Sequence, residues 1–261
     1  MKKAIFITVR TASTRLPQKC LLEVSGRKMI VHLIERLKRS KKAEIIVLCT
    51  TESKNDAMLC DIAKDNGILF FRGSAEDKLA RWLGAARKFN VEFFVTADGD
   101  DIFCEPELID LAFAQYEDTP ADFIEGKDLI CGSFTYAIKT KALEKVCEIK
   151  DADDTEMMWV YFTDTGLFQT EELRNVPPIF KRPEIRMTLD YEDDYKFFKT
   201  IMEHFVSENK KGFNLRDIVG FLDKNPQVIK MNQYLQERFL ANQKKKTKLV
   251  LKQEKILCKG Q

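Results

Sequence analysis

The sequence predicts an α/β fold built around a mixed, mostly parallel sheet. In the first half of the chain, short continuous apolar runs alternate with segments whose apolar residues repeat at helical spacing. Continuous apolar runs are typical of strands buried on both faces, and their alternation with helices indicates parallel β-α-β units. One later run, residues 133–140, is expected to add an antiparallel strand.

Each predicted element of the first half rests on a run in the printed sequence. Strands are expected at residues 4–9, 44–50, 68–71 and 91–97. Helices are expected over residues 29–37, over 54–65, around 79–86 and from 106 onward, and Asn66-Gly67 and Pro106 are typical end and start signals. Because ligands of parallel sheets bind beyond the carboxyl ends of the strands, we sought the chemistry in the segments that follow these strands.

The second half is less regular. Helices are expected at KALEKVCEI, at residues 195–206 and over 214–240 with a break at Asn225-Pro226, and Thr188-Leu189 is interpreted as a strand end. We predict two parts, a catalytic-type core over 1–208 and a helical C-terminal extension with a basic tail over 209–261. The tail is expected to be frayed or bound to a partner.

Composition excludes several classes of protein. Lys and Arg number 43 against 41 Asp and Glu, so the net charge of +2 gives no argument for nucleic-acid binding. No run reaches the length of a membrane span. The seven cysteines form no C-x-x-C pair, which argues against structural zinc and for free thiols in a reducing compartment. We therefore expect a cytoplasmic protein.

The loop after the first predicted strand, residues 10–19, is rich in groups that bind phosphate. It carries Arg10, Arg15 and Lys19 together with three hydroxyl side chains, among them that of Ser13, and no acid. Cations, hydroxyls and backbone N–H groups suit a polyphosphate. The loop has no glycine and is therefore not a Walker loop. A solvated basic turn is the alternative interpretation.

A cluster of carboxylates follows the fourth predicted strand, in the segment Asp98-Gly99-Asp100-Asp101. Magnesium binds one or two carboxylates together with phosphate oxygens of a substrate. Asp98 and Asp100 lie on the same side of an extended segment, so both are expected to face the loop 10–19. An acidic turn that caps the next helix is the alternative.

Two further segments allow two interpretations each. Asp190 stands at a predicted strand-to-helix junction, where it is either a helix N-cap or a metal ligand. Gly73 and Ser74 follow the third strand, where they either contact a base or ribose or belong to the capped start of the next helix.

The N-terminal segment ITVRTASTRLPQKCLLEVSGRKMIVHLIERL resembles the signature of the CMP-sugar synthetase-like cytidylyltransferases. These include the 3-deoxy-manno-octulosonate and acylneuraminate cytidylyltransferases and a spore-coat-polysaccharide branch. The matching positions are Arg10, Ser13, Arg15, Leu16, Pro17, Lys19, Gly26, Met29 and Ile30. RGSAEDKLARW, DGDDIFCEPELID and RMTLDYEDDY are similar to later segments of the spore-coat branch, and the resemblance covers residues 3–206.

The resemblance implies a Rossmann-like nucleotidyltransferase fold of three layers in residues 1–208, a homodimer, CTP as substrate and Mg²⁺ as cofactor. It implies Asp100 as the main metal ligand and Asp190 as the second. Together with the loop and strand-end arguments, the nucleotide is expected to contact Arg10, Ser13, Arg15, Lys19, Gly73, Ser74 and Asp98. Arg10, Lys19 and Asp100 are the expected catalytic residues.

The expected reaction is transfer of CMP from CTP to a sugar acid or similar acceptor with release of pyrophosphate, in the synthesis of activated sugars for surface polysaccharide. The segment Glu156–Tyr161 stands where relatives face the acceptor but lacks their His, so the acceptor stays open. Two alternatives remain. One is a glycosyltransferase that uses Asp98-Gly99-Asp100 as a D-x-D metal motif, and the other is a homologue that binds a nucleotide without catalysis.

Overall fold

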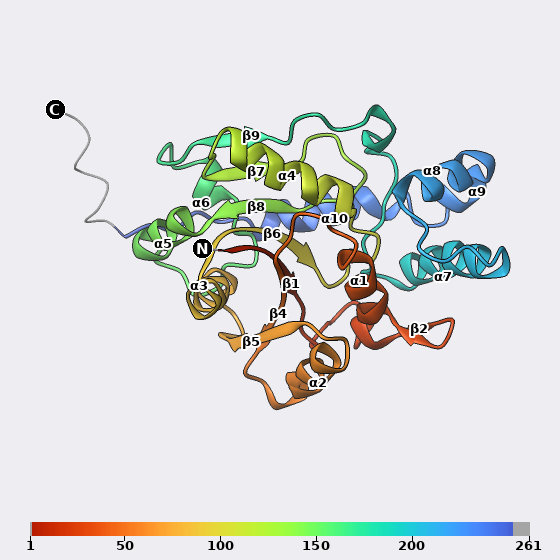
Figure 1. The fold of residues 1–261 in the computed structure, drawn as a ribbon, viewed down its shortest axis with the longest axis horizontal. Helices are drawn as coiled ribbons and strands as arrows, with labels where there is room; N and C mark the ends of the chain where they lie inside the picture. The colour runs from red at the N-terminus through yellow and green to blue at the C-terminus, as the bar shows by residue number, and fades with distance from the viewer. Residues whose placement is uncertain (1, 253–261) are drawn as a thin grey trace.

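The computed structural model describes residues 2–252 and contains a seven-stranded mixed sheet (Figure 1). Its strand order is β5-β4-β1-β6-β8-β7-β9. Four neighbouring strands are parallel: β5 (Leu69–Gly73), β4 (Ile45–Thr51), β1 (Lys2–Thr8) and β6 (Val91–Asp98). Beyond them, β8 (Tyr136–Lys139) runs antiparallel to β6, and β7 (Phe123–Glu125) and β9 (Thr170–Glu172) complete the sheet. A hairpin of β2 (Glu23–Val24) and β3 (Arg27–Lys28) stands apart.

Helices cover both faces of the sheet, which gives three layers. One face carries α1 (Met29–Leu37), α2 (Ala57–Asp65) and α4 (Pro106–Asp118), and the other carries α3 (Lys78–Phe89), α5 (Thr140–Ile149) and α6 (Val160–Thr163). The remaining helices are α7 (Glu192–Ser207), α8 (Leu215–Lys224), α9 (Pro226–Ile229) and α10 (Leu235–Lys246). In Figure 1, α7, α8 and α9 lie together at one side of the molecule, near α1.

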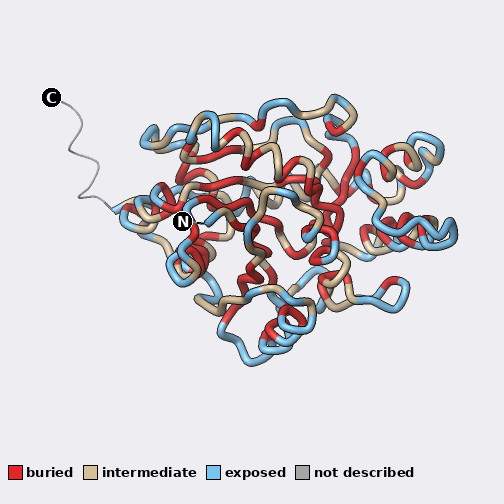
Figure 2. The backbone as a smooth tube through the Cα atoms, viewed as in Figure 1, coloured by how far each residue is buried: buried red, intermediate tan, exposed pale blue. Residues whose placement is uncertain are grey.

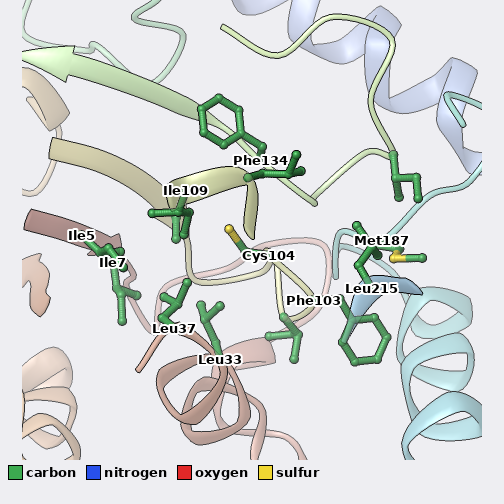
Figure 3. Packing of buried hydrophobic residues seen from close by; sticks show 14 of the residues in the cluster. Ile5, Ile7, Leu33, Leu37, Phe103, Cys104, Ile109, Phe134, Met187 and Leu215 are labelled. Carbon is green, nitrogen blue, oxygen red and sulfur yellow. The ribbon is translucent and has the colours of Figure 1, made fainter. Parts of the chain in front are cut away.

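The alternation of side chains along β1 explains the two cores. Ile5 and Ile7 point to the α1 side, whereas Ala4 and Phe6 point to the α3 side. Figure 3 shows Ile5 and Ile7 in the first core with Leu33 of α1. The buried segments of the tube in Figure 2 follow the strands of the sheet, as expected for a sheet covered on both faces. No helix within residues 2–252 has the length and apolar character needed to cross a membrane.

The structure confirms the mostly parallel α/β fold and the predicted strands and helices of the first half. The expected strand end at Thr188-Leu189 is wrong, because this segment makes only isolated backbone contacts and belongs to no strand. The tail is not frayed in its described part, since Leu251 pairs with Lys150 beside α5. Residues 253–261, with Cys258, lie outside the described part. The division into 1–208 and 209–261 stays a prediction.

Gly132 is expected to be important for stability because its backbone conformation and its close surroundings leave no room for a side chain. Its φ is +84°, and a Cβ atom there would lie 2.1 Å from the carbonyl oxygen of Met187. Gly132→Ala should lower the free energy of unfolding by about 2 kcal/mol or more, measured by urea unfolding. Gly220→Ala is the control: a Cβ there meets no atom within 4 Å, and the helical position should gain about 0.5–1 kcal/mol. Equal stability of the two variants would contradict this account.

Candidate active site

A cavity of about 900 Å³ opens at the carboxyl ends of β1 and β6. The loop after β1, the start of α3 and the segment after β6 line one part of it. Residues 126–136, residues 154–159, residues 183–190 and one face of α10 line the rest. The cavity therefore lies where the topology of a parallel sheet places ligand sites.

The loop after β1 is anchored at its start by Asp56. One carboxylate oxygen of Asp56 accepts hydrogen bonds from the backbone N–H and the hydroxyl of Thr11, at 2.7 and 2.6 Å, and the other accepts from the hydroxyl of Thr51. Burial alone would raise the pKa of Asp56, but these hydrogen bonds hold it below its ordinary value. The loop thus leaves the sheet from a fixed point, which presents Arg10 and the residues after it to the cavity.

At the end of this loop, Lys19 joins two carboxylates from distant parts of the chain. Its ammonium donates to Asp100, which follows β6, and to Asp190 Oδ1 at 2.8 Å. Arg15 Nη2 contacts the same oxygen of Asp190 at 2.5 Å. Two cations of the phosphate-type loop and two predicted metal ligands therefore form one cluster.

The cluster shifts the pKa values of its members in different directions. Burial would lower the pKa of Lys19, but Asp100 and Asp190 outweigh it and raise that pKa, so the ammonium stays charged. Burial raises the pKa of Asp100 although Lys19 opposes the rise, and Asp190 adds to it. Burial acts likewise on Asp190, but Lys19 and Arg15 prevail and lower its pKa. Asp190 is thus the more firmly ionised of the two carboxylates.

Asp190 is presented by a second network behind it. Arg186 is fully buried and contacts Asp190 Oδ2 at 3.4 Å and both oxygens of Asp194. Asp194 accepts from the backbone N–H of Asp190 and Tyr191 at the start of α7, where Tyr191 is the N-cap. Asp190 is therefore not the N-cap, and its side chain is left for Arg15 and Lys19.

Close backbone approach brings β1 and β6 together at the cavity. The N–H of Gly99 donates to the carbonyl of Thr8 at 2.8 Å, and a Cβ on Gly99 would lie 2.6 Å from Val9 Cβ. Beside it, Asp98 accepts from the ammonium of Lys78 at 2.9 Å, and that ammonium lies 4.9 Å from the centre of the Trp82 ring. Asp98 is thus held by the first residue of α3.

Comparison with known proteins identifies the family. A model of the cytidylyltransferase family matches residues 4–256. The chain belongs to the cytidylyltransferase family. The structure of a cytidylyltransferase from Leptospira borgpetersenii is 31% identical, with a TM-score of 0.77, and the match covers 88% of this chain and 97% of that one.

Two curated relatives agree with this assignment. Spore coat polysaccharide biosynthesis protein SpsF of Bacillus subtilis is 23% identical over 84% of this chain and 93% of its own length. The 3-deoxy-manno-octulosonate cytidylyltransferase of Chloroherpeton thalassium is 25% identical over 79% of this chain and 78% of its own. This chain is accordingly a CTP-dependent nucleotidyltransferase with a Rossmann-like fold, as the sequence resemblance implied.

Most of the site residues predicted from the sequence of the cytidylyltransferase line its cavity. These are Arg10, Ser13, Arg15, Lys19, Asp98, Asp100 and Asp190. Gly73 and Ser74 are not among the described residues that line it, because Arg81 lies against both: its side chain would meet a Cβ on Gly73, and its guanidinium donates to the carbonyl of Ser74. The start of the helix is capped by Asp77, which accepts from the N–H of Ala80.

Several residues of the site were missed by the sequence analysis. Asp56, which anchors the loop, lies in a segment whose pattern indicates only a helix, and Arg186, which supports Asp190, lies in one that carries only the family resemblance. Lys78 could have been found, because it is the first residue of a helix that follows a strand of the parallel sheet. The face of α10 carried no signal, since the cavity contact of that helix depends entirely on the tertiary fold.

The residues of the cytidylyltransferase fit the Mg²⁺ that its sequence resemblance implies. Asp100 and Asp190 both contact the same ammonium, so their carboxylates converge on one point of the cavity. Within residues 2–252 no group of three or more His, Cys, Asp or Glu side chains gathers as a complete metal site. Mg²⁺ binds one or two carboxylates together with phosphate oxygens of a substrate, so the pair Asp100 and Asp190 has the right chemistry for it.

The hydrogen bonds of Asp56 lead to a pH-dependent prediction. Its folded pKa is lowered, so the stability it contributes is present above the ordinary pKa of about 3.9 and is lost as the pH falls through the folded value. Asp56→Asn should cost about 1–3 kcal/mol of unfolding free energy at pH 7, and the difference from the wild type should shrink below about pH 4. Chemical denaturation at a series of pH values measures both effects.

Asp118→Asn, at an exposed position, is the control and should show neither the cost nor its pH dependence. A cost for Asp56→Asn that is the same from pH 7 to pH 3 would show that the charge of Asp56 is not what anchors the loop.

Proposed function

We propose that this cytidylyltransferase transfers CMP from CTP to a sugar acid or a similar acceptor, with release of pyrophosphate. The observation that carries the proposal is the cluster in which Arg15 and Lys19 meet Asp100 and Asp190 at the strand ends. It combines cations for a triphosphate with carboxylates for its metal in one cavity. The sugar-acid class is supported by the relative named as a 3-deoxy-manno-octulosonate cytidylyltransferase.

In this reaction an oxygen of the acceptor attacks the α-phosphorus of CTP. A bond forms between that oxygen and phosphorus, the bond from the α-phosphorus to the bridging oxygen breaks, and pyrophosphate leaves with the electron pair. Where the attacking oxygen is a hydroxyl, its proton passes to water. Arg10, Arg15 and Lys19 bind and neutralise the triphosphate, so their contribution is positioning and electrostatic stabilisation of charge on the phosphate oxygens. Lys19 suits this role because its raised pKa keeps it charged.

Mg²⁺ held by Asp100 and Asp190 would neutralise negative charge on the phosphates and orient them. Lys19 already occupies the space between these carboxylates. When the nucleotide binds, the ammonium of Lys19 would therefore exchange carboxylate oxygens for phosphate oxygens. Arg15 would keep a positive charge beside Asp190.

A glycosyltransferase with a D-x-D motif receives less support from the geometry. Such a motif needs both Asp98 and Asp100. Asp98 is paired with Lys78, whereas Asp100 is paired with Lys19, which also contacts Asp190. The first carboxylate is thus tied to α3. The pairing favours Asp98 as part of the nucleotide-binding wall.

The wider setting belongs to the same proposal. We place the enzyme in the cytoplasm, as a homodimer, in the synthesis of an activated sugar for a surface polysaccharide. The relative named as a spore coat polysaccharide biosynthesis protein supports the pathway.

The test is pyrophosphate release with Mg²⁺ and each of the four nucleoside triphosphates, against a panel of sugar acids, phosphorylated sugars and neutral sugars. Release should depend on CTP and on an acceptor. Asp100→Asn should lower kcat by about 100-fold or more, whereas Asp118→Asn should leave it unchanged. The proposed function would be contradicted if ATP were the only nucleotide that supports release, or if none of the acceptors in the panel supported release.

A further inference from the structure

The cations that line the cavity fall into two groups. Five come from the loop after β1 and the start of α3, namely Arg10, Arg15, Lys19, Lys78 and Arg81. Among the described lining residues, the remaining cation is Lys246, from the last turn of α10. The lining residues between 126 and 136 supply Asp128, hydroxyl groups and apolar groups, whereas Lys127 is not among them and pairs with Glu172.

One face of α10 is turned to the cavity. Gln236, Phe239, Gln243 and Lys246 line it, and their spacing of three, four and three residues puts them on one side of a helix. Lys244 is not among the lining residues and lies two positions from Lys246, on the opposite side. The polar groups of α10 that reach the cavity are thus amides followed by an ammonium.

The position of α10 is fixed by the buried network behind Asp190. Gln236 accepts from Arg186 Nη1 at 3.2 Å, and the ring of Phe239 lies 4.7 Å from the Arg186 guanidinium carbon. Arg186 in turn holds Asp190. The start of α10 is therefore registered against the predicted metal ligand, and its last turn projects over the cavity.

Within residues 2–252, the ion-pair partner of Lys246 is Glu156, and that pair is exchangeable. Its ammonium lies 3.3 Å from Glu156 Oε2, and the same oxygen lies 3.9 Å from Arg10 Nη2. The side chains of Lys246 and Glu156 are 54% and 41% exposed, and exposed ion pairs contribute little to stability. A ligand anion in the cavity can replace Glu156 at small cost.

We infer that α10 forms the acceptor-recognition wall of the cavity, with Lys246 as the counter-ion of an anionic group on the acceptor and Gln243 as a hydrogen-bond partner of its hydroxyls. The inference rests on the proposed function and deepens it, because it names the residue that binds the negative charge of the acceptor. Of the other described lining cations, Arg10, Arg15 and Lys19 are assigned to the triphosphate, and Lys78 and Arg81 donate to Asp98 and to the carbonyl of Ser74. Lys246 is the described lining cation that remains for a carboxylate or phosphate of the acceptor.

The experiment compares three charge variants with wild type. Lys246→Met should raise the KM for 3-deoxy-manno-octulosonate, or for whichever anionic acceptor of the panel reacts, by about 10- to 100-fold, the value of a hydrogen bond to a charged group. The KM for CTP should change less than twofold, and Lys246→Arg should restore most of the acceptor affinity. Lys244→Met, which removes the same charge from the opposite face, should change neither constant.

Glu156→Gln separates recognition from a structural ion pair. Recognition by Lys246 predicts an acceptor KM that is unchanged or lower, since the competing carboxylate is gone. If Glu156→Gln and Lys246→Met raise it equally, the pair is structural and the inference is overturned. It is also overturned if Lys246→Met raises the KM for CTP instead, or if wild type reacts only with neutral sugars, a result that would leave transfer of CMP from CTP intact but not the sugar-acid acceptor.

Calorimetry keeps the two proposals distinguishable. Each acceptor is titrated into wild type and Lys246→Met with CTP bound, under conditions where no pyrophosphate is released. Binding to wild type that Lys246→Met weakens supports the inference even if turnover fails and the proposed function is wrong. No binding of any anionic acceptor overturns the inference directly.

Discussion

The rest of the site depends on how the charge of Asp190 is accommodated. Its side chain is 1% exposed, and an ionised carboxylate at that depth is costly unless partners surround it. Lys19 and Arg15 approach it from the cavity and Arg186 from the interior. Asp100 and Asp194 contact the same cations, so three carboxylates face three cations. Removing any one cation therefore leaves an excess of negative charge, and the loop after β1, the segment after β6 and the start of α7 are held in one arrangement.

This arrangement holds two carboxylates close together while a cation between them reduces their mutual repulsion. Asp100 and Asp190 are like charges converging on one point, and Lys19 stands between them. A divalent cation bound to phosphate can take the same place, because it offers the carboxylates at least the charge that Lys19 withdraws. On the proposed function, charges already arranged in this way would favour a metal-bound anion.

The sequence predicted the features of the site that arise from local pattern and sheet topology. Continuous apolar runs identified the parallel strands, and the rule for strand ends placed Lys19 and Asp100 at one edge. Asp190 could not be placed in the same way. Its position depends on a hydrogen bond from the N–H of Leu189 to the carbonyl of Asp100 and on the buried Arg186–Asp194 pair, contacts that have no periodic signature. The strand β9, with the polar sequence TEE, was missed for a related reason, because only its pairing with β7 makes it a strand.

The C-terminal extension is where linear reasoning was least informative. A boundary near residue 208 treats the later helices as an appendage, yet Asn232 donates to Asp194 Oδ1 at 2.9 Å and to the carbonyl of Arg186 at 3.1 Å. Asn232 is fully buried there, so its loss would leave polar groups of the Arg186 network without partners. The extension therefore supports the carboxylate that faces the loop after β1, and α10 continues from that support directly over the cavity. The proposed acceptor wall and the position of the predicted metal ligand Asp190 are consequently linked through one buried side chain, that of Arg186.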